Sequence, residues 1–281
     1  MKLKEIKVCL CTVGKLENLY VREYVSHYIN LRTDKIFIYD NNNVNGERFE
    51  DVIKDYIEKG FVEIINFRGI LNPQLIAYQD CLNNNYNKYN WLIFYDMDEF
   101  IYLKDYGNIK YFLNQKKFIK CQTIQLNIFF HEDNNLLYYD NRTLSERFIK
   151  KIKRPVEALK SILKGNNKIN INCVHNLNNY LKSCNGFGKI NNKEKIKIFT
   201  TNPDFKFYYI DHFCFKSTEE FVNKLNKGDA IFGYDNKAKS KKIDWYFGIN
   251  KLTSQKINYI EKFTKINLNK YRIQLSNKSL Y

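Results

Sequence analysis

The sequence predicts an α/β protein, built on a single doubly wound, mostly parallel sheet that is flanked by helices and followed by a basic C-terminal extension. Three observations support this fold class. Strand-like and helix-like patterns alternate at βαβ spacing over the N-terminal part of the chain. An apolar strand then runs directly into three carboxylates. Finally, 44% hydrophobic residues in a chain of 281 are enough to form a full core.

The predicted elements of the α/β part follow one another in a regular order. Short apolar runs predict buried strands, and apolar residues at helical spacing predict the helices between them. Gly60 marks the end of one helix, because glycine readily adopts the backbone conformation that terminates a helix. We expect strands at residues 6–12, 35–39, 61–65 and 91–95, and helices at residues 16–31, 49–59 and 73–83.

The pattern changes beyond residue 120. Ser217-Thr-Glu-Glu is typical of a helix start, and the stretch 150–197 is rich in Asn and Lys and is expected to be irregular. Further strands are expected at residues 123–130 and 205–215, and short helices after residue 244. We therefore predict two parts, an α/β domain over residues 1–235 and a basic helical tail that packs on it over residues 236–281.

Charge is distributed unevenly along the chain. The formal net charge is +16, but residues 1–140 carry 17 basic and 19 acidic side chains, so the excess lies in the second half. A basic surface predicts an anionic partner, either a membrane surface or an acidic substrate. A sequence this rich in Asn, Lys and Ile can also be basic through compositional bias alone. Only 8 of the 46 basic residues are Arg, so no nucleic-acid partner is expected.

Targeting and redox signals are few. The chain has no run of roughly eighteen apolar residues that would predict a transmembrane helix, and its first residues lack the apolar stretch of a signal peptide. We therefore expect a cytoplasmic protein, with peripheral contact at the inner face of the membrane. The seven cysteines contain no CxxC pair, so reduced structural thiols are expected, with Cys9 and Cys11 as small buried hydrophobic residues.

The sharpest chemical feature is the segment Trp91-Leu-Ile-Phe-Tyr-Asp96-Met-Asp98-Glu99. A buried strand ends in carboxylates here, and open α/β sheets bind their ligands at this edge. Strand alternation would place Asp96 and Asp98 on one side and Glu99 on the other. Two close carboxylates repel each other, and a hard cation such as Mn²⁺ or Mg²⁺ relieves this repulsion while leaving positions open for phosphate oxygens. The segment therefore predicts a metal–diphosphate site, with a solvated acidic turn as the alternative.

A second polar cluster, Asp40-Asn41-Asn42, also follows an apolar strand. A carboxylate and amides at this edge can form hydrogen bonds with a uracil or a ribose. The same residue types favour turns on their own, so composition leaves both interpretations open.

These motifs follow one another in an order that resembles glycosyltransferase family 92 and its family-2-like bacterial and viral relatives. The resemblance spans roughly residues 5–230. The matching segments are Leu10 to Asn18, Glu23 to His27, Lys35 to Asn42, Gln74 to Asp80, Trp91 to Phe100, Gln125 to Asn127, Glu146 to Phe148, Lys160-Ser161, and Asp211 to Ser217. Where the relatives carry Lys-Asn-Glu near the first strand, this chain has Lys15-Leu-Glu-Asn18. The resemblance implies a GT-A fold with a metal-binding DxD motif.

The resemblance also implies roles for individual residues. Asp98 and His212 would ligate the metal, and Asp96 would contact the metal or the ribose. A structural strand histidine is the alternative for His212. The nucleoside pocket would be lined by Thr12, Asp40 and Asn42. The donor would be a nucleotide sugar, most simply a UDP-sugar, the acceptor a hydroxyl of a glycan or a lipid-linked glycan, and the stereochemistry inverting.

A catalytic base is expected in the loop after the strand at residues 123–130, which reads His131-Glu132-Asp133. Asp133 is preferred because the matching loop of the relatives resembles Gly-Asp-Asn or Gly-Ser-Asn. Glu132 is the neighbour that could replace it, and His131 has a suitable ordinary pKa. A solvated loop without a catalytic role is the alternative.

Two other functions are compatible with these residues. A nucleotidyltransferase also uses carboxylates at strand ends with a metal, but it releases pyrophosphate instead of a nucleoside diphosphate. A non-catalytic basic protein would bind nucleic acid or an anionic surface in a salt-sensitive way. The chain has no Walker-type glycine loop, which argues against an ATPase.

Overall fold

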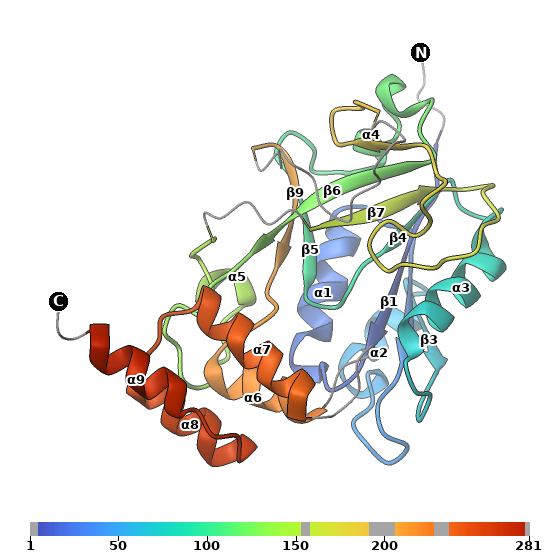
Figure 1. Ribbon diagram of the computed structural model, residues 1–281. Helices are drawn as coiled ribbons and strands as arrows, with labels where there is room; N and C mark the ends of the chain where they lie inside the picture. The colour runs from blue at the N-terminus through green and yellow to red at the C-terminus, as the bar shows by residue number, and fades with distance from the viewer. Residues whose placement is uncertain (1–4, 153–157, 191–205, 228–235, 279–281) are drawn as a thin grey trace. The chain divides into compact units, whose positions relative to one another are not determined.

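The computed structural model describes residues 5–152, 158–190, 206–227 and 236–278 (Figure 1). The chain separates into two compact units, of which unit 1 comprises residues 1–129 and 155–212, and unit 2 comprises residues 130–154 and 213–281. Residues 130–154 thus group with residues 213–281. Among the described helices, none is both long enough and apolar enough to cross a membrane.

The N-terminal half of the sheet in unit 1 is parallel, as predicted. Its strands lie in the order β3-β2-β1-β4, so that Cys11 of β1 pairs with Phe37 on one side and Phe94 on the other. Helices connect these strands, and the predicted ranges agree closely with the observed ones. The elements are β1 Val8–Gly14, α1 Asn18–Asn30, β2 Lys35–Asp40, α2 Glu50–Glu58, β3 Val62–Asn66, α3 Pro73–Asn85 and β4 Trp91–Phe94.

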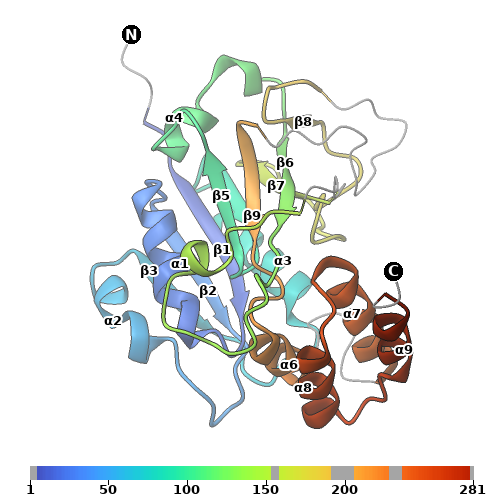
Figure 2. The ribbon, with the colours of Figure 1, turned by 90° about the vertical axis from the view of Figure 1, so that its left-hand side faces the viewer.

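The other half of the sheet contains antiparallel pairs, which make the mostly parallel sheet a mixed one. The order continues as β4-β7-β6-β9-β5, and β7 is antiparallel to both β4 and β6. β5 and β9, which lie side by side in Figure 2, are antiparallel as well. These antiparallel neighbours are far apart in the sequence, since β4 and β7 are separated by residues 95–158 and β5 and β9 by residues 104–207. The elements are β5 Glu99–Leu103, α4 Ile109–Leu113, the 3₁₀ helix η1 Lys116–Phe118, β6 Thr123–Phe130, β7 Leu159–Lys164, β8 Ser183–Asn185 and β9 Tyr208–His212.

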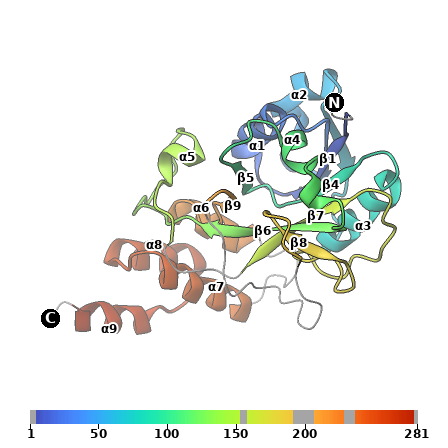
Figure 3. The same cartoon turned by 90° about the horizontal axis from the view of Figure 1, so that it is seen from above.

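Both faces of the parallel half are covered. Figure 3 shows α1 and α2 on one side of β1 and α3 on the other. Cys9 and Cys11 are fully buried in a cluster with Tyr78 of α3, which confirms their predicted role as small hydrophobic residues. On the opposite face Tyr24 of α1 packs edge-on against Phe100 of β5 at 5.6 Å between ring centroids.

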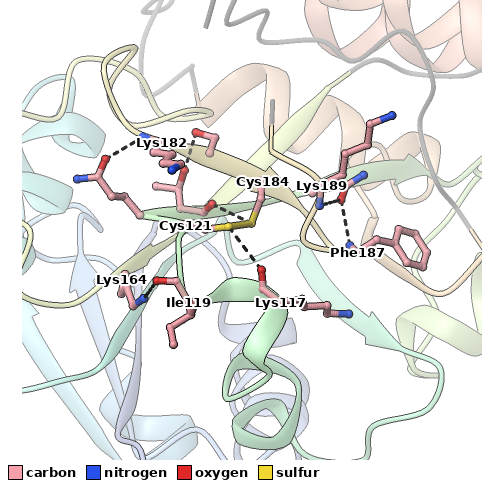
Figure 4. The surroundings of a disulfide bond; sticks show 12 residues. Lys117, Ile119, Cys121, Lys164, Lys182, Cys184, Phe187 and Lys189 are labelled. Carbon is pink, nitrogen blue, oxygen red and sulfur yellow. Dashed lines mark hydrogen bonds between the residues drawn. A yellow bond between two sulfur atoms is a disulfide. The ribbon is translucent and has the colours of Figure 1, made fainter. Parts of the chain in front are cut away.

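Two further expectations about unit 1 are wrong. The stretch 150–197, expected to be irregular, contains β7 and β8. The cysteines are not all reduced, because Cys121 and Cys184 form a disulfide (Figure 4). Parallel pairing of β8 with β6 places Ile124 opposite Cys184 and so brings two cysteines together that are 63 residues apart. Nothing in their spacing along the chain could have indicated this pairing.

Unit 2 is helical in its described part. The predicted helix start at Ser217 is confirmed, because the Ser217 hydroxyl accepts a hydrogen bond from the Glu220 amide and Glu220 Oε2 accepts one from the Ser217 amide. Tyr246 stacks on Phe221 with ring centroids 4.2 Å apart. The helices are α5 Leu144–Arg147, α6 Thr218–Lys227, α7 Asn236–Ile249, α8 Ser254–Thr264 and α9 Asn269–Lys278.

Candidate active site

The carboxyl ends of the parallel strands in unit 1 gather the first group of predicted site residues. Thr12 is fully buried on β1, and the pairing of Gly14 with Asp40 places the ends of β1 and β2 side by side. Gly14 allows a close approach here, because a Cβ atom at this position would lie 2.6 Å from the Phe49 ring and 2.7 Å from Met97 Cε. The turn at residues 96–99 therefore packs directly over the end of β1.

The DxD segment forms a tight turn between β4 and β5. The Glu99 amide donates to the Asp96 carbonyl at 3.0 Å, and the Asp96 amide donates to Glu99 Oε2 at 2.9 Å. β4 ends at Phe94, so the alternation expected from an extended strand does not apply. Asp96 and Asp98 have different partners.

Asp98 lies beside His212. Pairing of β5 with β9 places His212 opposite Glu99, and the Asp98 Oδ1 and His212 Nε2 atoms are 3.2 Å apart. One carboxylate oxygen and one imidazole nitrogen at this separation can bind the same divalent cation, with the remaining positions left to phosphate oxygens. Among the described residues, no group of three or more His, Cys, Asp or Glu side chains is arranged to hold a metal ion alone. The donor set thus fits a cation that protein and diphosphate bind together.

Asp96 turns away from this pair and toward β7 and α3. Its Oδ2 atom lies 2.9 Å from Lys160 Nζ, and its Oδ1 atom accepts hydrogen bonds from Gln74 Nε2 and, at 3.1 Å, from the Tyr78 hydroxyl. The ammonium group of Lys160 also lies 3.2 Å from Glu99 Oε2. The structure therefore brings two of the three predicted metal ligands together and gives the third, Asp96, other partners in a hydrogen-bonded network. Glu99 links the two groups, because its Oε1 atom lies 3.9 Å from His212 Nδ1.

Burial sets the protonation of this network. Burial raises the pKa of Glu99 to about 7, although the nearby Lys160 ammonium acts in the opposite direction. For Lys160, burial alone would lower the pKa, but the carboxylates of Asp96 and Glu99 more than offset this effect and hold the pKa above its ordinary value. Lys160 is therefore a permanent cation within the site.

Asp40 is held by an arginine. The Arg68 Nη2 atom lies 2.6 Å from Asp40 Oδ2, and Arg68 also donates to the carbonyls of Asn43 and Glu47. The second carboxylate oxygen of Asp40 accepts a hydrogen bond from the Asn42 amide at 2.9 Å. Asp40 is only 2% exposed, and its contacts with Arg68 and with the Asn42 amide fix the loop that follows β2.

Asn42 supports the neighbouring loop after β1. Its Oδ1 atom accepts a hydrogen bond from the Leu16 amide at 2.7 Å, while Leu16 has a φ of 55°. A non-glycine residue adopts this left-handed conformation at a cost in free energy, and such strain is common at functional sites. Leu16 belongs to the segment in which this chain departs from the motif of its relatives.

The predicted base residues lie in unit 2. Asp133 is 1% exposed, and its Oδ2 atom lies 2.6 Å from Lys256 Nζ and accepts a hydrogen bond from the Tyr246 hydroxyl. Glu132 is partly accessible, whereas His131 is buried and its Nδ1 atom contacts the Phe148 carbonyl. Glu132 is therefore the more accessible carboxylate of the two candidates.

Sequence reasoning missed the roles of several residues that complete this site. Lys160 did not stand out, because β7 reads Leu-Lys-Ser-Ile-Leu-Lys and also contains Lys164, in a stretch rich in lysine. Arg68 did not stand out either, because a single arginine in a loop is ordinary. The residues concerned are Arg68, Gln74, Tyr78 and Lys160.

The family of the chain follows from a comparison with family models. The model "Glycosyltransferase family 92" matches residues 4–244, which is most of the chain. The chain therefore belongs to glycosyltransferase family 92, and this confirms the resemblance that its motifs indicated. It also places the protein among the transferases.

Similar proteins of known activity include two from Arabidopsis thaliana. "Galactan beta-1,4-galactosyltransferase GALS2" is 29% identical over 98 residues, and "Galactan beta-1,4-galactosyltransferase GALS3" is 28% identical over 98 residues. In each case the match covers 32% of this chain and 19% of the relative. The matched part thus spans about a fifth of the curated relatives.

Similar solved structures include the S. aureus protein TarS. Residues 1–349 of TarS in complex with UDP-GlcNAc align with a TM-score of 0.40 and 11% identity, covering 92% of this chain and 80% of that fragment. The complex of the same fragment with UDP aligns with a TM-score of 0.33 and 11% identity, covering 48% of this chain and 38% of the fragment.

Proposed function

We propose that this protein is a metal-dependent hexosyltransferase that transfers a sugar from a UDP-sugar to a hydroxyl group of a glycan or of a lipid-linked glycan. The observation that carries the proposal is the pairing of Asp98 with His212 at the carboxyl edge of the sheet, next to an ion pair between the buried Lys160 and the partly exposed Asp96. Membership of family 92 and the galactosyltransferase names of its relatives support a hexose as the transferred group.

Different residues of unit 1 would bind different parts of the donor. Asp98 and His212 would hold a divalent cation, which when bound stabilises the negative charge that develops on the departing diphosphate. Thr12 and Asn42 would line the nucleoside pocket. The loop after β2, which the ion pair of Asp40 with Arg68 fixes, would form one wall of this pocket. Preorganised groups of this kind act without reorganisation at the moment of reaction, which makes electrostatic stabilisation effective.

The acceptor hydroxyl needs a base, and we propose a carboxylate of the loop at residues 131–133 for this step. Attack by the hydroxyl on the sugar carbon forms the new glycosidic bond, the bond to the diphosphate breaks, and the base takes the hydroxyl proton. Direct displacement of this kind inverts the configuration. Glu132 is partly accessible, whereas the Asp133 carboxylate is already paired with Lys256, so accessibility favours Glu132 over the preferred prediction.

The place of action is part of the proposal too. The cytoplasmic location is an expectation, and the proposed contact with anionic lipid rests on the excess of basic residues in the second half of the chain. The disulfide between Cys121 and Cys184 favours an oxidising compartment, because such bonds persist there and are rare in the cytosol. Labelling the free thiols of protein taken directly from cells decides between the cytosol and an oxidising compartment. Protection of both cysteines would contradict a cytosolic location.

The direct test of the proposed activity is a screen of nucleotide sugars with Mn²⁺ present and with Mn²⁺ removed by a chelator. We expect release of UDP from one UDP-hexose, faster with a glycan acceptor, and loss of this release without the metal. Release of pyrophosphate would indicate a nucleotidyltransferase. Salt-sensitive DNA binding without turnover of any nucleotide sugar would indicate a binding protein.

A further inference from the structure

Lys160 is unusual because a charged side chain rarely lies in the middle of a sheet. It sits on β7, opposite Leu126 of the neighbouring strand β6, and is 1% exposed. Removing an ammonium group from water costs several kcal/mol unless close partners compensate for it. A lysine at this position is therefore expected to have a specific electrostatic task.

The partners of Lys160 are the two outer carboxylates of the DxD turn. Its Nζ atom lies 2.9 Å from Asp96 Oδ2 and 3.2 Å from Glu99 Oε2. The other oxygen of Asp96 accepts hydrogen bonds from Gln74 and Tyr78. Both oxygens of Asp96 are thus occupied by fixed donors of β7 and α3.

The central carboxylate of the turn has a different environment. Asp98 Oδ1 lies 3.2 Å from His212 Nε2, on β9. Lys160 lies against Asp96 and Glu99, whereas the neighbour of Asp98 is His212, so Asp98 is the carboxylate of the turn that the ammonium group does not contact. A divalent cation bound there would meet a carboxylate that Lys160 does not neutralise directly.

On this basis, and resting on the proposed function, we propose that Lys160 is a positioning residue of the metal site. Its ammonium group holds Asp96 out of direct metal coordination and leaves Asp98 and His212 as the protein ligands. Asp96 and Glu99 then act as carboxylates that orient the turn. Removing the positive charge of Lys160 should free an oxygen of Asp96 and make the site more negative, so that a divalent cation binds more tightly.

The test measures binding of Mn²⁺ alone, without nucleotide, by electron paramagnetic resonance of the free ion. We expect Lys160→Met to bind Mn²⁺ roughly tenfold more tightly than the wild type, because an ammonium charge has been removed close to the cation. This gain should disappear in the double variant Lys160→Met with Asp96→Asn. Asp96→Asn alone should weaken Mn²⁺ binding by no more than roughly tenfold, since it removes one nearby negative charge but no ligand. Lys160→Arg should stay within about threefold of the wild type, since it keeps the charge.

Lys164→Met is the matched control. Lys164 also lies on β7, but its Nζ atom donates to the Ile119 carbonyl and has no carboxylate partner among the described residues. It should bind Mn²⁺ as the wild type does. A merely structural lysine would lower the stability of Lys160→Met without raising its affinity for Mn²⁺, so thermal unfolding is measured in parallel.

The outcomes separate the two proposals. A folded Lys160→Met variant with unchanged or weaker Mn²⁺ affinity overturns the role of Lys160. If that variant does not fold, Asp96→Asn decides, because a large loss of Mn²⁺ affinity there would make Asp96 a metal ligand and overturn the proposal. A wild-type protein that binds no Mn²⁺ and turns over no nucleotide sugar contradicts the proposed function itself.

Discussion

Asp98 and His212, which are 114 positions apart in the sequence, meet at the end of two paired strands with their Oδ1 and Nε2 atoms 3.2 Å apart. Each residue was a candidate ligand from its motif, but only the antiparallel pairing of β5 with β9 brings them together. Asp96, which the same motif made an equal candidate, pairs with Lys160. The site is therefore defined by strand pairing as much as by the DxD motif.

The first prediction separates the two candidate bases. Glu132→Gln should lower turnover roughly 10²–10⁴-fold, which is the usual contribution of a general base, with little change in nucleotide affinity. Asp133→Asn should instead lower the free energy of unfolding by about 3 kcal/mol, because Lys256 would remain buried without its counter-ion. Steady-state kinetics and urea unfolding of both variants check this. A stable Asp133→Asn protein without turnover would indicate that Asp133, and not Glu132, is the catalytic base.

The second prediction concerns the lysines of α7. Lys237 and Lys241 are exposed on this helix, with Lys239 and Lys242 partly exposed. If the basic part of the chain contacts anionic lipid, sedimentation with anionic vesicles should fall steeply between about 0.05 and 0.3 M salt, because screening weakens the attraction. Changing these four lysines to Gln should weaken binding by roughly 1 kcal/mol per charge. Equal sedimentation with neutral and with anionic vesicles would indicate that the basic excess of the chain reflects compositional bias alone.

The third prediction follows from a buried histidine of α1. Burial lowers the pKa of His27, whose Nε2 atom donates to the Ile101 carbonyl at 3.0 Å. Between the lowered folded-state pKa and about 6.5 the unfolded chain binds more protons, so stability rises with pH through this range and is lost as the pH falls. His27→Gln keeps a donor but cannot titrate, so its stability should depend less on pH between about 5 and 7. Urea unfolding across this range measures the slope, and equal slopes in both proteins would be contrary evidence.

The parallel half of the fold was predictable because its signals are local. The apolar runs of β1, β2 and β4 and the periodicity of α1 lie within short windows, and the carboxylates after β4 mark the edge by themselves. In the antiparallel half, β6 agrees with the strand predicted at residues 123–130 and β9 lies within the one predicted at 205–215, but the Asn- and Lys-rich composition around β7 conceals a strand. Contacts such as Lys160–Asp96 and Cys121–Cys184 depend on strand neighbours far apart in the sequence. Sequence periodicity carries no information on such neighbours.

The central claim is that Asp98 and His212 bind the divalent cation that sugar transfer requires. The most direct measurement is Mn²⁺-dependent release of UDP by Asp98→Asn, with Asp105→Asn as a control, since Asp105 is exposed and lies outside the DxD turn. We expect Asp98→Asn to fold normally and to lose metal-dependent release by at least about 10²-fold, because a metal ligand stabilises the transition state by several kcal/mol. The control should act as the wild type does. A folded Asp98→Asn protein with wild-type, Mn²⁺-dependent turnover would contradict the claim.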